Sequence, residues 1–557
     1  MSIRRNSAPS GTRKLVVIAC VLFGALMVLC AGIVAAVYWL PDYLAGRTIT
    51  LEVACSPEKQ SLFEELAERF NDSKTKTPQG KRIQIETVYL EPEAMVEAAA
   101  AGSFRAITPD STIWLSHLDR VWQERTGSDA SLVGETARYA ISPVIIAMWE
   151  DTARSMGYPS RSLGWSDLLA RAKDDPDFRW SHPSTGSASG LLATLAEFYA
   201  GAGKTRGLTK EDVTSESTLE YVAAIEKTVR YYGESEQAVI EQVLEKGPSY
   251  LDAFVVQEQM VIYFNARSKQ KLVAVYPLEG ALWEDHPIAF LERADASSDH
   301  RLAFTAFKEF LQSRESQMLV LQHGYRPIDL GLSLDEATSP IRIANGVDPS
   351  EPQTALQVPS AAVIDVVRDV WWYTKRHTNV YLVVDVSGSM EGEKLADAQE
   401  ALRTFVSQIR GDTERVGLIE FASSVREATP LGQLESNRAE LGTSIGALVA
   451  DGNTALLDAV DIAYTRLQSL GDEERINAIV VMTDGKENNS HISLRKLRDK
   501  VRRGNDAGIP VVIFCIAYGS DADMGTLETI AEASGGQTRQ GDPETIKNLY
   551  KILSSYF

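Results

Sequence analysis

The chain alternates short apolar runs with longer segments in which apolar residues recur every three or four positions. The short runs have the length and β-branched content of buried strands, whereas the longer segments have the period of amphipathic helices. Strands are predicted at residues 49–54, 83–89, 141–148, 380–384, 416–421, 476–482 and 511–517, and helices at 58–70, 93–101, 191–200, 361–373, 395–409, 455–470 and 544–553. This alternation predicts an α/β fold built on parallel sheets.

An uncharged apolar run occupies residues 15–40, before the first predicted strand. It is longer than the roughly 20 residues that cross a bilayer, and longer than the apolar core of a cleavable signal. The tail before it, residues 1–14, is basic through Arg4, Arg5, Arg13 and Lys14. By the positive-inside rule this tail stays in the cytoplasm. We therefore expect a single-pass anchor in the cell membrane, with the rest of the chain outside the cytoplasm.

The length of 557 residues predicts several domains rather than one core. Residues 48–345 form one α/β region, and residues 361–557 form a second. Between them, residues 346–360 contain three prolines among polar residues, a composition typical of a linker. The net charge of −20 argues against nucleic-acid binding, because backbone phosphates favour clustered lysine and arginine.

A group of oxygen donors follows the apolar strand predicted at residues 380–384. Asp385, Ser387 and Ser389 come directly after it, and Gly388 permits a sharp turn that brings their side chains together. Carboxylates and hydroxyls are ligands that Mg²⁺, Mn²⁺ or Ca²⁺ prefers, whereas zinc favours histidine or cysteine. Taken alone, the same residues could be polar turn formers at the end of a strand.

Two later loops supply further oxygen donors. Thr454 lies just ahead of a predicted helix, and Asp484 ends the strand predicted at residues 476–482. In a doubly wound sheet, loops at the carboxyl ends of the strands meet over one crevice. The sequence therefore predicts a site where three loops hold one divalent metal ion.

This pattern, Asp-x-Ser-x-Ser followed by a distant Thr and a distant Asp, resembles a von Willebrand factor type A domain with a metal-ion-dependent adhesion site. The resemblance implies a doubly wound, Rossmann-like fold and a divalent ion, foremost Mg²⁺. It implies that Ser387, Ser389 and Thr454 ligate the metal directly. It further implies that Asp385 and Asp484 bind the ion directly or through water, and that a carboxylate of a protein partner completes its coordination.

The region 48–345 resembles a bacterial extracellular solute-binding protein of the two-lobed, periplasmic kind. The cues are Ser56-Pro57-Glu58 before the first helix, residues 141–148 as a first crossing strand, and residues 254–265 as the returning strand. The resemblance implies that residues 143–265 form a second lobe. It also implies that a small solute binds between the lobes.

A polar loop precedes the helix predicted at residues 191–200, and it contains Ser184, Thr185, Gly186 and Ser187. Hydroxyls and free amides at a helix N-terminus suit an anion or a hydroxylated solute. Together with Ser56, these residues are the candidate solute contacts. The same residues could simply cap the helix, and both interpretations stay open.

The sequence offers no nucleophile–base pair and no nucleotide-binding loop. We therefore expect no enzymatic activity, but a membrane-anchored binding protein with a metal site for an acidic protein partner and a solute module in tandem. One alternative is a transporter-associated solute receptor whose second domain docks a permease or an assembly partner. A metal-dependent enzyme is the other alternative.

Overall fold

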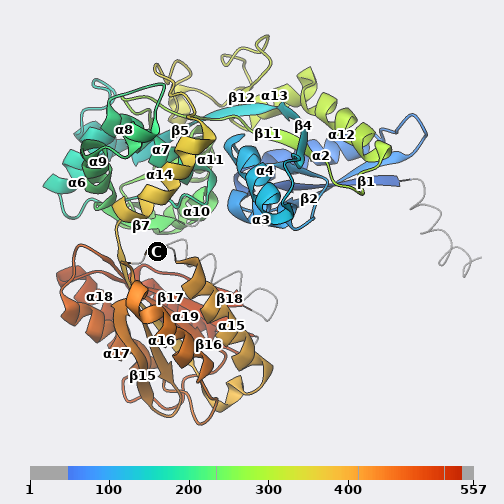
Figure 1. Ribbon diagram of the computed structural model, residues 1–557. Coiled ribbons are helices and arrows are strands. Elements are labelled where there is room, and N and C mark those ends of the chain that lie inside the picture. Colours follow the sequence, from blue (N-terminus) through green and yellow to red (C-terminus); the bar gives the residue numbers. More distant parts are fainter. Residues whose placement is uncertain (1–47, 234, 410, 412, 520, 542–557) are drawn as a thin grey trace, which may run out of the picture.

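The computed structural model describes residues 48–541 except positions 234, 410, 412 and 520 (Figure 1). The predicted anchor at residues 15–40 and the predicted closing helix at residues 544–553 lie outside the described residues. None of the helices in the described part is long and apolar enough to cross a membrane. The described chain is a mixed α/β protein with three sheets.

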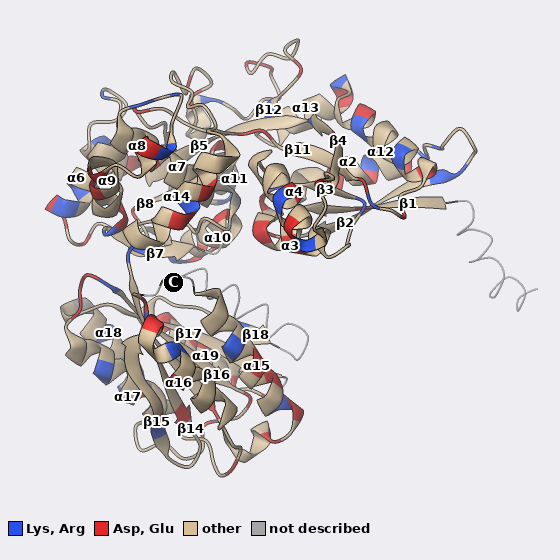
Figure 2. Cartoon of the chain, in the orientation of Figure 1, with Lys and Arg blue, Asp and Glu red and all other residues tan. Residues whose placement is uncertain are grey.

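The first sheet has the order β2-β1-β3-β11-β4, and we call this part lobe 1. Its strands are β1 (Thr48–Cys55), β2 (Arg82–Tyr89), β3 (Ala106–Thr108), β4 (Val133–Arg138) and β11 (Pro287–Leu291). Its helices are η1 (Pro57–Lys59), α2 (Gln60–Asp72), α3 (Pro92–Ala100), α4 (Ile113–Thr126), α12 (Ser298–Leu311) and α13 (Arg314–Gln322). On α2, Leu62, Phe63, Leu66 and Phe70 recur at helical spacing and are buried in the core of this lobe, so the predicted helix is confirmed. Acidic and basic residues are mixed along the exposed helices, as on α12 (Figure 2).

The second sheet has the order β10-β5-β8-β6-β7, with β9 and β12 also paired to β5, and we call this part lobe 2. Its strands are β5 (Ala140–Trp149), β6 (Trp180–Pro183), β7 (Val229–Gly233), β8 (Ala253–Gln257), β9 (Leu272–Val275), β10 (Trp283–Glu284) and β12 (Arg326–Pro327). Its helices are α5 (Glu150–Ser155), α6 (Trp165–Asp174), α7 (Ala188–Ala202), α8 (Lys210–Val213), α9 (Glu216–Glu226), α10 (Glu236–Lys246), η2 (Gly247–Ser249) and α11 (Glu258–Arg267).

The chain crosses from β4 of lobe 1 into the long strand β5, as predicted for residues 141–148. The return was predicted as a strand over residues 254–265, and this is wrong beyond Gln257. There α11 begins, because Met260, Val261 and Phe264 recur at helical spacing and are all buried.

The third sheet has the order β15-β14-β13-β16-β17-β18 and is parallel except for β15 (Figure 1). Its strands are β13 (Thr378–Asp385), β14 (Arg415–Phe421), β15 (Val425–Gln433), β16 (Ile476–Thr483), β17 (Val511–Tyr518) and β18 (Thr538–Gly541). Its helices are η4 (Gly388–Met390), α15 (Glu393–Gln408), α16 (Leu434–Gly446), α17 (Leu456–Leu470), α18 (Leu494–Ala507) and α19 (Met524–Ser534). We call this part the C-terminal unit. The strand order is that of a doubly wound fold, which reverses direction between β13 and β16.

Helix α14 (Ala361–Thr374) connects the lobes to the C-terminal unit. It leads directly into β13, as predicted, but it packs against α7, α8 and α9 of lobe 2 and also reaches α4 of lobe 1. Val367 and Trp371 are buried in the core shared by the lobes. The preceding segment, which follows η3 (Ile343–Asn345), also lies on lobe 2, because Gln357 donates its amide to Thr205 O at 3.0 Å.

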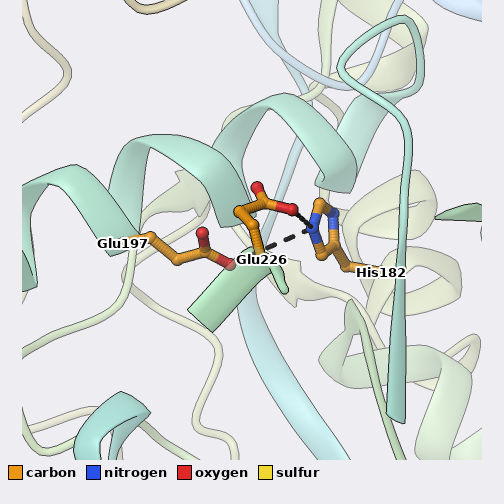
Figure 3. Close-up of side chains that lie close together, drawn as sticks. All are labelled: His182, Glu197 and Glu226. Atoms are coloured by element: carbon orange, nitrogen blue, oxygen red, sulfur yellow. Dashed lines mark hydrogen bonds and ion pairs between the residues drawn. The ribbon is translucent and has the colours of Figure 1, made fainter. Parts of the chain in front are cut away.

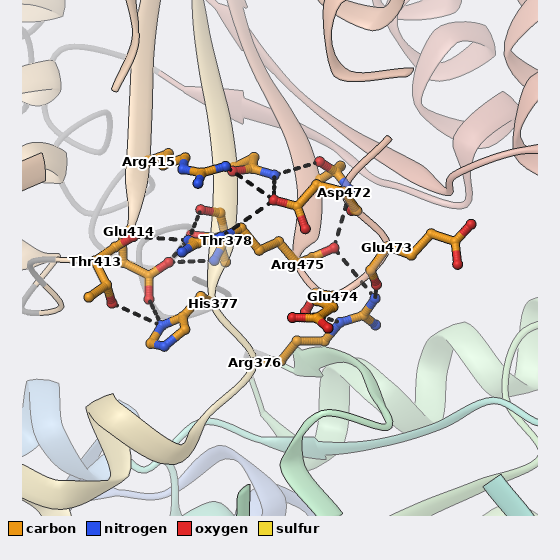
Figure 4. Close-up of polar contacts among 12 residues, drawn as sticks. Arg376, His377, Thr378, Thr413, Glu414, Arg415, Asp472, Glu473, Glu474 and Arg475 are labelled. Atoms are coloured by element: carbon orange, nitrogen blue, oxygen red, sulfur yellow. Dashed lines mark hydrogen bonds and ion pairs between the residues drawn. The ribbon is translucent and has the colours of Figure 1, made fainter. Parts of the chain in front are cut away.

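A buried polar junction joins α14 to the third sheet at the N-terminal ends of its strands (Figure 4). Lys375 and Glu414 form an ion pair at 2.9 Å, with both side chains fully buried. Arg376 spans the two units, because its guanidinium donates to Val229 O of lobe 2 at 3.0 Å and to Glu473 O at 2.7 Å. The C-terminal unit is therefore attached to lobe 2 through its amino edge.

Candidate metal site and solute site

The five predicted metal ligands lie at the carboxyl edge of the third sheet, at the point where the strand order reverses. Asp385 ends β13, Asp484 directly follows β16, and Thr454 lies two residues before α17. The Ser387 amide donates to Asp385 Oδ1 at 2.7 Å, and Ser389 Oγ donates to Asp484 Oδ1 at 2.6 Å. The doubly wound sheet thus brings together groups that are up to 99 positions apart in the chain.

The space between these groups can be judged from Gly485. A Cβ atom built on this glycine would lie 3.2 Å from Thr454 Oγ1, 3.5 Å from Ser389 Oγ and 3.6 Å from Asp385 Oδ2. Three loops therefore present their oxygens to one small volume. Since every donor is a carboxylate or a hydroxyl, the set fits a hard divalent cation such as Mg²⁺.

Two carboxylates and one lysine determine the electrostatics of this cluster. Burial raises the pKa of Asp385, and the nearby Asp484 raises it further, against the hydrogen bonds from Thr483 and Ser387. The Lys394 ammonium contacts Asp484. Because like charges at close range repel, a bound cation between the two carboxylates would lower their free energy.

The site opens into a cavity of about 630 Å³ on the surface of the C-terminal unit. Its lining includes Ser389, Thr454 and Asp484, together with Lys486 and Asn488. Asn488 was not predicted, and it fixes the Thr454 loop by accepting from the Thr454 amide at 2.9 Å and donating its own amide to Thr454 O at 3.1 Å. The sequence indicates this role of Asn488 only through its position, four residues after Asp484.

The predicted solute loop lies between β6 and α7, where the two lobes meet. The Gly190 amide donates to Ser187 Oγ at 3.3 Å, so Ser187 caps α7. The Glu93 amide of lobe 1 donates to Gly186 O at 3.4 Å, and a Cβ atom on Gly186 would overlap Glu93 Oε2. A carboxylate of the protein itself therefore lies at the start of α7, and Ser184 and Thr185 are buried beside it.

Ser56 directly follows β1 in lobe 1, and its hydroxyl lies beside Asp110 in a buried polar group. Lys59 Nζ donates to Thr108 O at 2.6 Å and to Pro109 O at 2.8 Å, and it lies 3.8 Å from Asp110. Burial opposes ionisation, but Lys59 lowers the pKa of Asp110 to about 2. Neither Lys59 nor Asp110 was predicted as a site residue, because in the sequence both look like ordinary charged residues near the ends of strands.

A second buried polar network, to which α14 contributes Trp371, is built around His182, Glu197 and Glu226 (Figure 3). His182 Nε2 lies 3.3 Å from Glu226 Oε2 and 4.0 Å from Glu197 Oε1. Trp371 Nε1 of α14 donates to Glu226 Oε1 at 2.6 Å, and Tyr232 donates to Glu226 Oε2 at 2.7 Å. Burial, together with Glu226, raises the pKa of Glu197 well above its ordinary value. Through the hydrogen bond from Trp371 to Glu226, this network serves as the docking point of α14.

Family models match the two halves of the chain separately. Residues 51–326 match the model of bacterial extracellular solute-binding proteins, and residues 379–551 match the von Willebrand factor type A domain. Both resemblances stated from the sequence are thereby confirmed. The second match begins within β13, after α14. The chain joins a solute-binding domain to a type A domain, a combination consistent with a role in binding or adhesion.

Individual relatives cover only parts of the chain. Inter-alpha-trypsin inhibitor heavy chain H4 of Sus scrofa is 28% identical over 29% of this chain and 18% of its own length. The uncharacterized protein YfbK of Escherichia coli (strain K12) is 25% identical over 32% of this chain and 30% of its own. The solved sulfate-binding protein SubI from Mycobacterium tuberculosis H37Rv is 20% identical, covers 51% of this chain and 88% of its own, and has a TM-score of 0.37. The chain therefore spans less than a third of the length of these two curated relatives.

Proposed function

We propose that this protein is a membrane-anchored binding protein whose type A domain captures a protein partner through a divalent metal ion, while the two lobes bind a small solute. The observation that carries the proposal is the convergence of Asp385, Ser389 and Thr454 around Gly485. No group in this cluster is arranged as a nucleophile with its base. The proposed activity is binding, not catalysis.

Ser387, Ser389 and Thr454 would hold the ion directly, while Asp385 and Asp484 would do so directly or through water. When bound, a divalent ion supplies an electrophilic centre that accepts a carboxylate oxygen. The open cavity in front of Ser389 and Asp484 supports access for a side chain of a partner. Lys486 lines the same cavity, and its ammonium can pair with an acidic side chain of the partner.

The test compares the response of the wild type and three variants to metal. Because a ligand that binds only the folded state stabilises it, added Mg²⁺ should raise the melting temperature of the wild type. Asp385→Ala should lose this shift, and Thr454→Ala should keep part of it, since water can replace a neutral hydroxyl. Asp521→Ala is the matched control, because Asp521 lines the same cavity but is outside the ligand set.

The measurement is a melting curve of the full-length protein against Mg²⁺ and Mn²⁺ at fixed ionic strength. Equal shifts for the wild type and Asp385→Ala would show that Asp385 is not a ligand, and the adhesion-site proposal would then fall. A loss of the shift in Asp521→Ala as well would indicate general attraction of cations to an acidic surface.

A further inference from the structure

Several buried carboxylates in this protein are paired with a cation of their own. Glu258 accepts two hydrogen bonds from Arg326, at 2.7 and 2.9 Å. Glu414 is paired with Lys375 at 2.9 Å. This pairing is expected, because an isolated charge in the interior costs several kcal/mol.

Three buried carboxylates between the lobes depart from this rule, and we call Glu58, Glu236 and Glu284 the interlobe acidic cluster. Glu58 belongs to η1, which follows β1 of lobe 1, whereas Glu236 begins α10 of lobe 2 and Glu284 lies in β10. Glu236 raises the pKa of both of the other carboxyls, so the three groups influence one another across the contact between the lobes.

Two members of the cluster have no partner of any kind in the part of the chain that the structure describes. All four carboxylate oxygens of Glu58 and Glu284 are buried, and none accepts a hydrogen bond from another residue. Glu236 accepts from Gln257, through its amide at 2.9 Å and its side chain at 3.2 Å, and the nearby Ser189 hydroxyl also favours its charged form. Burial raises the pKa of each of the three carboxyls, that of Glu236 to about 7.

The nearby positive charge is already committed elsewhere. The Lys59 ammonium donates to two backbone oxygens and offsets Asp110. His286 lies 3.4 Å from Asp110, but burial lowers the pKa of its imidazole, so the ring stays neutral at pH 7. The contact between the lobes therefore carries more acidic than basic side chains.

Resting on the proposed solute-binding function, we propose that the two lobes close on a small organic cation whose ammonium groups pair with Glu58, Glu236 and Glu284. Such a ligand supplies both the charge and the N–H donors that these oxygens lack. An anionic solute is disfavoured, because it would enter a region where carboxylates outnumber the cations. The start of α7, the natural place for an anion, is already met by Glu93.

The spacing of the cluster favours a molecule with several amino groups over a single metal ion. Among the described residues, the one group of three acidic or histidine ligands with atoms within 4.8 Å of one another is His182, Glu197 and Glu226. The interlobe cluster does not converge in this way. Its carboxylates are instead supplied by elements of both lobes, which favours a cation with more than one amino group over a single ion.

Isothermal titration of the full-length protein tests this assignment, with putrescine, spermidine and arginine as cationic probes and sulfate as the anionic probe. EDTA is present throughout, so that the type A site holds no metal. We expect one cation to bind with a stoichiometry near one, and Glu58→Gln and Glu284→Gln each to weaken this binding at least tenfold. Glu309→Gln, which changes an exposed acid on α12, should bind as the wild type does.

A second measurement separates a ligand contact from a structural role. Without ligand, Glu58→Gln and Glu284→Gln should melt at or above the temperature of the wild type at pH 8, because each replaces a carboxylate that lacks a partner. A large fall in melting temperature for both variants would overturn the assignment.

Other results would also overturn the assignment of a cationic solute, and some of them would still support solute binding by the lobes. Binding of sulfate alone would refute the cation while supporting solute binding by the lobes. Stabilisation by Mn²⁺ in the absence of EDTA that depends on Glu58 would replace the organic cation with a metal ion. If both variants bind the cation as tightly as the wild type does, the binding is a general attraction of cations to the acidic surface. If none of the probes binds, the proposal that the lobes bind a solute would fall as well.

Discussion

Replacing Glu414 with glutamine tests whether one buried ion pair holds the junction at the amino edge of the third sheet. Glu414 contacts Lys375 at 2.9 Å, and both side chains are fully buried. Its other carboxylate oxygen accepts hydrogen bonds from the amide and the hydroxyl of Thr378, the first residue of β13. Glutamine keeps the shape of the side chain but leaves the Lys375 ammonium without its counterion.

The structure gives two routes to the size of the effect. Burial alone would raise the pKa of Glu414, but Lys375, His377 and Thr378 lower it from 4.5 to about 2. At about 1.4 kcal/mol per pKa unit, this shift corresponds to about 3 kcal/mol. Breaking a buried ion pair by removing one partner typically costs about 3–5 kcal/mol, in agreement with that figure.

The sign of the pH dependence follows from the lowered pKa. Because the folded-state pKa lies below the unfolded value, the stabilisation by Glu414 is fully present above pH 4.5 and is lost as the pH falls towards 2. The difference between the wild type and Glu414→Gln should therefore be largest at neutral pH and shrink in acid.

Hydrogen exchange of peptides from β13 and β14 is the suitable assay, because it reports the local free energy of opening. At pH 7 the exchange of β13 amides should accelerate about a hundredfold, since about 1.4 kcal/mol corresponds to a factor of ten. Glu420→Gln is the matched control, because Glu420 pairs at the surface with Arg426 and such pairs contribute at most about 1 kcal/mol. If β13 exchanges equally fast in both variants, the junction does not depend on this ion pair.

Three further predictions concern the lobes and the anchor. Trp371→Phe should destabilise the docking of α14 by about 1–3 kcal/mol, because the hydrogen bond to buried Glu226 is lost. Calorimetry should show a smaller effect for Trp372→Phe, since Trp372 is the neighbouring and less buried tryptophan. Equal effects of the two substitutions would contradict the role of that hydrogen bond. Burial raises the pKa of Glu236 to about 7, so its contribution to stability is present below pH 4.5 and is lost as the pH rises through 7. The melting temperature of the wild type should therefore fall relative to Glu236→Gln across this window, and parallel curves would refute the prediction. Protease added to intact spheroplasts should remove the mass beyond residue 40, whereas full protection of the type A domain would argue against an extracytoplasmic location.

The sequence predicted best those parts of the fold that depend on local patterns. The strands β13, β14, β16 and β17 are continuous apolar runs, because a central parallel strand is buried on both faces. Edge strand β15 was missed, since residues such as Arg426 and Glu427 interrupt any apolar run, and Pro430 lies within it. The five candidate metal ligands could be named because three of them lie in one short motif.

What the sequence could not provide is the pairing of distant residues. Glu58, Glu236 and Glu284 are more than 40 positions apart and look like surface acids in the sequence, but the fold buries all three. The apolar stripe of α14 predicted that one of its faces is buried, but it did not indicate that the partners are α7, α8 and α9. Periodicity shows that a face is covered, whereas it carries no information about which element covers it.

The direct continuation of α14 into β13 determines how the molecule would respond to mechanical tension. A partner held at Asp385 would pull on the carboxyl end of β13, while the chain leaves the other end of this strand through Lys375. β13 is hydrogen-bonded along its length to β14 on one side and to β16 on the other, so tension would load both ladders in shear and spread over many bonds at once. Helix α14, in contrast, contacts the lobes through side chains such as Val367 and Trp371. Under a pull on the partner, α14 would therefore detach from the lobes before the sheet that carries the metal site came apart.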